Sequence, residues 1–158
     1  MSRLRKFLDL PHADRGFLLE AAFWLGLARL ALLFLPFRRL APFLGRQMAQ
    51  SPEEAGAAPA QLLEGVSWAV AAASRHLPWE CKCLAQALAG KAMLRRRGVP
   101  STLYLGLAKG DAGLQAHAWL RCGAHILTGR QDMAGFTIIA TFAEDHGDSV
   151  TCGNCQRY

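Results

Sequence analysis

One stretch of the sequence reads CKCLAQALAGKAMLRRRGVPSTLYLGLAK, residues 81–109, and it decides the fold. Its first part, residues 81–97, is rich in Ala and Leu and predicts a helix. Gly98 and Pro100 end that helix, because glycine adopts the left-handed backbone at a helix end without strain. In residues 101–109 Leu alternates with other residues, which predicts a strand that buries one face.

The strand pattern continues downstream in three short runs, residues 116–122, 124–129 and 136–142. Gly123 separates the first two runs and predicts a hairpin there. Upstream, residues 1 to about 48 are dense in Leu, Ala and Phe and predict helices that Pro36 and Pro42 interrupt. Helices followed by an antiparallel sheet indicate an α+β fold.

The expected domain organisation has three parts. An N-terminal helical segment, residues 1–50, packs on the core or docks partners. A catalytic core follows over residues 51–145; it starts with a linker-like stretch (51–60) and a short apolar helix (61–74). Residues 146–158 form a polar tail that we expect to be mobile.

Composition and charge narrow the function classes. The chain has 158 residues with a formal charge of +6, and no aromatic residues are interleaved with its basic clusters, which disfavours nucleic-acid binding. Five cysteines and an opening without a secretory pattern predict free thiols in the cytoplasm. Cys152 and Cys155 have C-x-x-C spacing, but too few further ligands lie nearby for zinc, so we expect surface thiols, no metal and no cofactor.

The apolar stretch Phe17–Phe37 has about the length that crosses a bilayer. Glu20 and Arg29 interrupt it, and such charges are costly near the centre of a membrane helix. We therefore expect burial or docking rather than spanning, with partner proteins as the favoured surface and peripheral contact with an anionic membrane second.

Cys83 and His117 are the residues that suggest chemistry. Cys83 falls in the first turn of the expected helix, where unpaired N–H groups and the helix dipole favour a thiolate. His117 lies in Ala116-His117-Ala118-Trp119 at the expected start of a strand, 34 residues later. A helix packed across a sheet would bring the two side chains together as nucleophile and base.

The motifs Cys83-Leu84-Ala85-Gln86-Ala87-Leu88 and Ala116-His117-Ala118-Trp119, in series, resemble those of the lasso-peptide leader peptidases. These are bacterial maturation proteins in the transglutaminase-like branch of papain-type folds. The resemblance implies that Cys83 attacks the leader–core bond of a precursor peptide and that His117 is the base. It also implies two partners, a separate leader-recognition protein and an ATP-dependent cyclase.

The sequence departs from that family after the histidine strand, because residues 120–129 contain no carboxylate. Asp132 is the nearest candidate for the third catalytic residue, and a backbone carbonyl that orients His117 is the alternative. Two other functions remain open. The same Cys–His pair also suits an acyltransferase or transglutaminase, and the missing acid suits a non-catalytic scaffold of a peptide-maturation complex.

Overall fold

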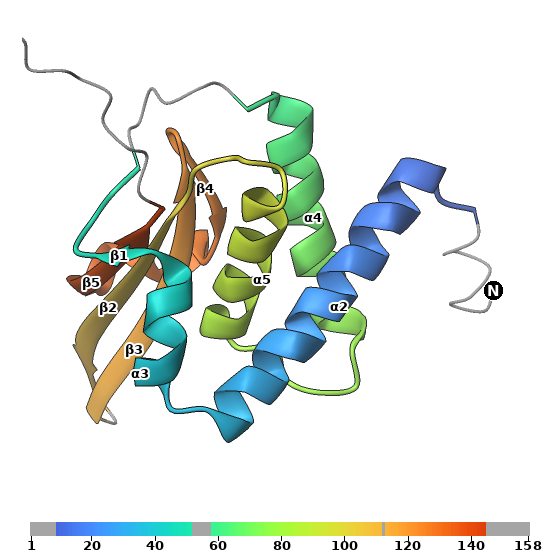
Figure 1. Ribbon diagram of the computed structural model, residues 1–158. Helices are drawn as coiled ribbons and strands as arrows, with labels where there is room; N and C mark the ends of the chain where they lie inside the picture. The colour runs from blue at the N-terminus through green and yellow to red at the C-terminus, as the bar shows by residue number, and fades with distance from the viewer. Residues whose placement is uncertain (1–8, 52–57, 112, 145–158) are drawn as a thin grey trace, which may run out of the picture.

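The structure is a computed structural model that describes residues 9–51, 58–111 and 113–144. Its elements are α2 (His12–Phe34), α3 (Phe37–Leu40), η1 (Ala41–Leu44), β1 (Arg46–Gln47), α4 (Ala60–His76), α5 (Cys83–Arg95), β2 (Thr102–Gly110), β3 (Gly113–Cys122), β4 (His125–Thr128), η2 (Arg130–Gly135) and β5 (Thr137–Ala143). Helices precede an antiparallel sheet, so the α+β prediction is confirmed (Figure 1).

The helices form a layer in which α5 lies between the sheet and α2 (Figure 1). α2 packs against both α4 and α5, and it buries the row Ala21, Leu25 and Ala28 against them. This row repeats every three to four residues, which is the spacing of one helix face. α2 therefore packs on the part of the chain expected to be the catalytic core.

The sheet has the strand order β1-β5-β2-β3-β4, and its described pairs are all antiparallel. Leu103 of β2 pairs with Leu120 of β3, and both belong to the core that α5 covers. Gly90 of α5 sits so close to β3 that a Cβ there would lie 2.9 Å from Leu120. Glycine at this position allows the helix to approach the sheet.

The buried lysine Lys91 fastens α5 to the sheet. Its Nζ lies 2.9 Å from the Glu144 carboxylate and donates a second hydrogen bond, also 2.9 Å, to the Ser101 carbonyl oxygen. Burial lowers the pKa of Lys91, and the adjacent Glu144 charge opposes that shift. The pair fixes the helix carboxyl end beside the start of β2 and the end of β5.

Three local predictions need correction. The helix expected over 81–97 is confined to Cys83–Arg95, so Cys81 precedes it. β3 begins at Gly113, where φ is 114°, so His117 lies inside the strand and not at its start. The tight glycine turn allows β2 and β3 to pair along almost their whole lengths. Residues 46–47 were expected to be helical, but they form β1 because β5 offers them a pairing edge.

Candidate active site

Cys83 is the first residue of α5, directly after the extended N-cap residue Lys82. No side chain caps this helix end, and its first turn holds no acidic residue. The first N–H groups of a helix have no partner within the helix, and they carry the positive end of its dipole. A substrate oxygen that becomes negative beside Cys83 would therefore meet hydrogen-bond donors and a positive dipole end. The Cys83 side chain is half-buried and packs against the core.

The other two cysteines that the structure describes are more buried than Cys83. Cys81 lies against the core with its Sγ 3.8 Å from the Trp79 carbonyl oxygen, and burial raises the pKa of this thiol. Burial also raises the pKa of Cys122, in β3. A raised pKa keeps sulfur protonated near neutral pH, and a protonated thiol is a poor nucleophile. Cys83 is therefore the described cysteine best suited to react.

Gln86 fixes the position of the two residues before Cys83, and the sequence did not predict this role. Its Nε2 donates a hydrogen bond of 2.8 Å to the Cys81 carbonyl oxygen. Its backbone N–H donates to the Lys82 carbonyl oxygen at 3.1 Å. The two bonds fix the residues before Cys83 relative to the helix. The available signal was a polar residue within the otherwise apolar run of residues 84–90.

The His117 ring is anchored within β3. Its Nε2 lies 2.8 Å from the Gly129 carbonyl oxygen, and its faces contact Trp119 and Phe136 with ring centroids 5.9 and 5.2 Å away. A carbonyl oxygen only accepts hydrogen bonds, so Nε2 carries the proton and donates it. In the neutral ring this leaves the lone pair on Nδ1, the nitrogen that is free to act as a base.

Gly129 supplies this carbonyl from the turn between β4 and η2. The sequence predicted a backbone carbonyl as the alternative to an acid, but it did not identify Gly129 as the residue that provides it. Its φ of 76° is left-handed. A Cβ there would lie 2.5 Å from the Ala118 carbonyl oxygen and 3.1 Å from His117 Nε2. A residue with a side chain therefore does not fit beside the ring, and the backbone provides the acceptor. The signal was the absence of a carboxylate in residues 120–129.

Asp132 lies in η2, three residues after Gly129, and its side chain is outside the part of the structure that is described. The partner that the structure gives to the His117 ring nitrogen is Gly129. The carbonyl that sequence analysis offered as an alternative to an acid is thus present, and the role of Asp132 stays a prediction. Cys152, Cys155 and the tail 146–158 also lie outside the described residues.

The two catalytic candidates lie on elements that pack together, α5 and β3. Side chains alternate along a strand, so Ala118 and Leu120 form the row that faces the α5 core, and His117 belongs to the row of Trp119. Among the described residues no hydrogen bond joins Cys83 to His117, and no group of three or more His, Cys, Asp or Glu is placed to hold a metal. His117 therefore lies in the row opposite the one that faces α5, and the contact expected between Cys83 and His117 is not found among the interactions of the described residues. The catalytic roles of the two residues stay predictions.

Residues 31–141 match the family described as the transglutaminase-like superfamily, so that the matched region contains both Cys83 and His117. No curated protein and no solved structure matches the chain.

Proposed function

Because the chain belongs to the transglutaminase-like superfamily, we propose that it is a cysteine peptidase that removes the leader from a ribosomally made lasso-peptide precursor. Members of this superfamily are typically cysteine peptidases or transglutaminases. The observation that carries the proposal is the position of Cys83 as the first residue of an uncapped helix that packs on the histidine strand.

The reaction begins with the transfer of the Cys83 proton to Nδ1 of His117. The thiolate attacks the carbonyl carbon of the leader–core bond, and the N–H groups at the start of α5 stabilise the oxygen that becomes negative. His117 returns the proton to the leaving amine, which carries the core peptide away. Water then attacks the remaining thioester, and this releases the leader and restores the Cys83 thiol.

Because Cys83 and His117 are held separately, the proposed reaction requires that the bound substrate brings them together. Catalytic hydrogen bonds in substrate-free enzymes are often long, and they tighten in the complex. The proposal therefore requires that precursor binding at the start of α5 brings Sγ within reach of Nδ1 of His117, whose side chain belongs to the strand row that does not face α5. Gly129 keeps the correct imidazole tautomer throughout, since its carbonyl holds the Nε2 proton. Asp132, nearby in η2, is the acid that would support the imidazolium.

The proposal includes the partners that the sequence resemblance implies. A leader-recognition protein delivers the precursor in the cytoplasm, and an ATP-dependent cyclase closes the ring of the released core. An acyltransferase is the second candidate function, because an amine is able to take the acyl group from the same thioester. The observation that supports this second function is again the position of Cys83 at the start of α5, because the same thiol forms the thioester in either reaction.

Mass spectrometry of a precursor incubated with this protein and a leader-recognition protein tests the proposal. The peptidase predicts free leader and free core, and the Cys83→Ala variant should give neither. Addition of a small primary amine distinguishes the alternative, because an acyltransferase would give the leader as its amide. An intact precursor with the wild-type protein, with all partners present, would favour the scaffold function.

A further inference from the structure

The long helix α2 exposes a continuous row of large apolar side chains. We name as the apolar stripe the six residues Leu19, Phe23, Leu27, Leu30, Leu33 and Phe34. Each is at least 45% exposed, and Phe34 reaches 78%. From Leu19 to Leu30 they follow one another at three- to four-residue intervals, and Leu33 and Phe34 lie three and four residues after Leu30, so all six lie along one face of a helix about 34 Å long. Scattered apolar residues on a surface are ordinary, but a contiguous patch of this kind marks an interaction site.

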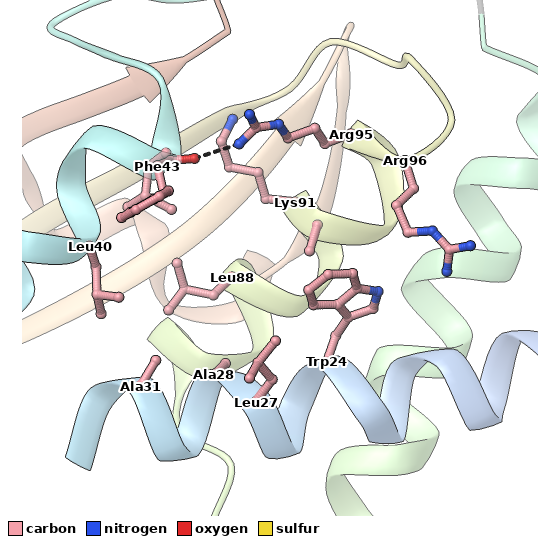
Figure 2. Close-up of a pocket in the computed structure, with 12 residues that line it drawn as sticks. Trp24, Leu27, Ala28, Ala31, Leu40, Phe43, Leu88, Lys91, Arg95 and Arg96 are labelled. Carbon is pink, nitrogen blue, oxygen red and sulfur yellow. Dashed lines mark hydrogen bonds between the residues drawn. The ribbon is translucent and has the colours of Figure 1, made fainter. Parts of the chain in front are cut away.

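A groove beside α2 extends this surface inward. It holds about 610 Å³, and Leu27 of the apolar stripe is part of its wall. Figure 2 shows Trp24, Leu27 and Ala31 of α2 on one side of the groove, with Leu40 and Phe43 on another. Arg95 and Arg96 lie on the rim that α5 provides, and Arg95 donates a hydrogen bond to the Phe43 carbonyl oxygen. The apolar surface of the groove thus ends at the positively charged side chains of Arg95 and Arg96.

The charge of this region is of one sign. Residues 21–51 contain four Arg and no Asp or Glu. Arg38 and Arg39 follow the end of the apolar stripe within five residues, and both are exposed. The nearest acid, Glu20, forms ion pairs with Arg96 and Arg97, and its side chain is 12% exposed. An apolar face with cations at its end is complementary to an anionic lipid surface.

From this combination we propose that α2 lies flat on an anionic membrane, with the apolar stripe in the lipid and Arg38 and Arg39 at the headgroups. This goes beyond the proposed catalytic function and does not depend on it. A second copy of the chain fits less well, because its residues 21–51 also carry four Arg and no acid and so offer the arginines no opposite charge. By length and composition alone α2 is able to cross a membrane. Spanning would, however, remove Ala21, Leu25 and Ala28 from their contacts with α4 and α5.

Flotation with lipid vesicles tests the proposal, because bound protein rises in a density gradient and aggregated protein sinks. The wild-type protein should float with vesicles of phosphatidylcholine mixed with phosphatidylglycerol, and much less with phosphatidylcholine alone. The variant Phe23→Gln/Leu30→Gln/Phe34→Gln should bind about a hundredfold more weakly. The variant Arg38→Gln/Arg39→Gln should lose about fivefold per arginine on the anionic vesicles only.

The matched control is Leu114→Gln/Ile139→Gln, which removes exposed apolar side chains from the sheet and should float like the wild type. Circular dichroism and thermal unfolding confirm that each variant is folded. Three results would overturn the proposal: no flotation of the wild-type protein, equal flotation of the Phe23→Gln/Leu30→Gln/Phe34→Gln variant, or membrane binding that resists extraction by high salt and alkaline carbonate. Lipid-free self-association that this triple variant abolishes, without flotation of the wild type, would assign the apolar stripe to a second copy.

Discussion

His117 Nε2 lies 2.8 Å from the backbone carbonyl oxygen of Gly129, a residue that cannot itself carry an acid. In a triad the third member holds the histidine in one tautomer and stabilises the imidazolium. A carbonyl performs the first task, since it accepts only a proton on Nε2. It performs the second less well because it carries a partial and not a full negative charge.

Replacement of Cys83 by Ala should abolish turnover of the precursor, whereas Cys81→Ala should keep most of it. Cys83 stands at the helix start with a half-buried thiol, and Cys81 is buried with a raised pKa. Turnover by mass spectrometry and the rate of labelling by a thiol-reactive probe near neutral pH measure both variants. Full activity in Cys83→Ala would remove this residue from the mechanism.

Loss of His117 should slow the reaction on the order of 10²–10⁴-fold, the usual contribution of a general base. The variant His117→Ala must first be shown to be folded, because the ring contacts Trp119 and Phe136. His117→Gln fills more of the same space and serves as the matched variant. A loss of tenfold or less in both folded variants would assign the base to another residue.

Gly129→Ala should slow the reaction strongly and also lower the stability of the fold. The new Cβ would collide with the Ala118 carbonyl oxygen and approach His117 Nε2, at a backbone angle that glycine tolerates best.

Asp132→Asn should slow the reaction by less than about tenfold, since the Nε2 proton is already donated to Gly129. The turnover rates of Gly129→Ala and Asp132→Asn, each relative to the wild-type protein, are measured and compared. A larger loss in Asp132→Asn would restore the acid as the main orienting group.

Glu20 should make stability depend on acidity. The hydrogen bond from Arg97, with N and O 2.6 Å apart, is the largest cause that holds the pKa of Glu20 below its ordinary value of 4.5. A carboxyl group with a lowered folded-state pKa stabilises the fold above its unfolded-state pKa, and this contribution is lost as the pH falls through the folded-state value. Glu20→Gln should lower the free energy of unfolding at pH 7 by about 1 kcal/mol.

Urea unfolding between pH 7 and pH 3 measures the Glu20 effect, with Glu64→Gln on the exposed face of α4 as the control. The wild-type protein should lose stability more steeply on acidification than Glu20→Gln does. Parallel curves for these two proteins would mean that the ion pairs between α2 and the end of α5 contribute nothing measurable.

Much of the fold could be predicted because its signals are local. The Ala- and Leu-rich run ended by Gly98 gives α5, and alternating Leu residues give β2. The turn at Gly123 between β3 and β4 is confirmed as well. β1 could not be predicted, since a two-residue strand exists only through its pairing with β5, which is almost a hundred residues away in the sequence.

The candidate site was predictable in part for the same reason. Cys83 carries a local signal, the start of a helix, and His117 stands in a recognisable strand motif. The partner of His117 is a backbone atom, and no residue type marks a backbone acceptor in a sequence. Gly129 becomes visible only when β3 and the turn after β4 are placed side by side, because the requirement for glycine arises from the Ala118 carbonyl oxygen.

The strand order has a consequence for the timing of synthesis. β5 is the last described strand in the chain, yet it lies between β1 and β2 in the sheet. A ribosome completes the helix that carries Cys83 nearly fifty residues before it reaches the end of β5 at Ala143. Until then β1 has no neighbour, and one edge of β2 stays open to other strands. During synthesis the chain therefore exposes α5 and the apolar stripe before the sheet is complete. A membrane or chaperone that binds the growing chain would contact its helices before its sheet has formed.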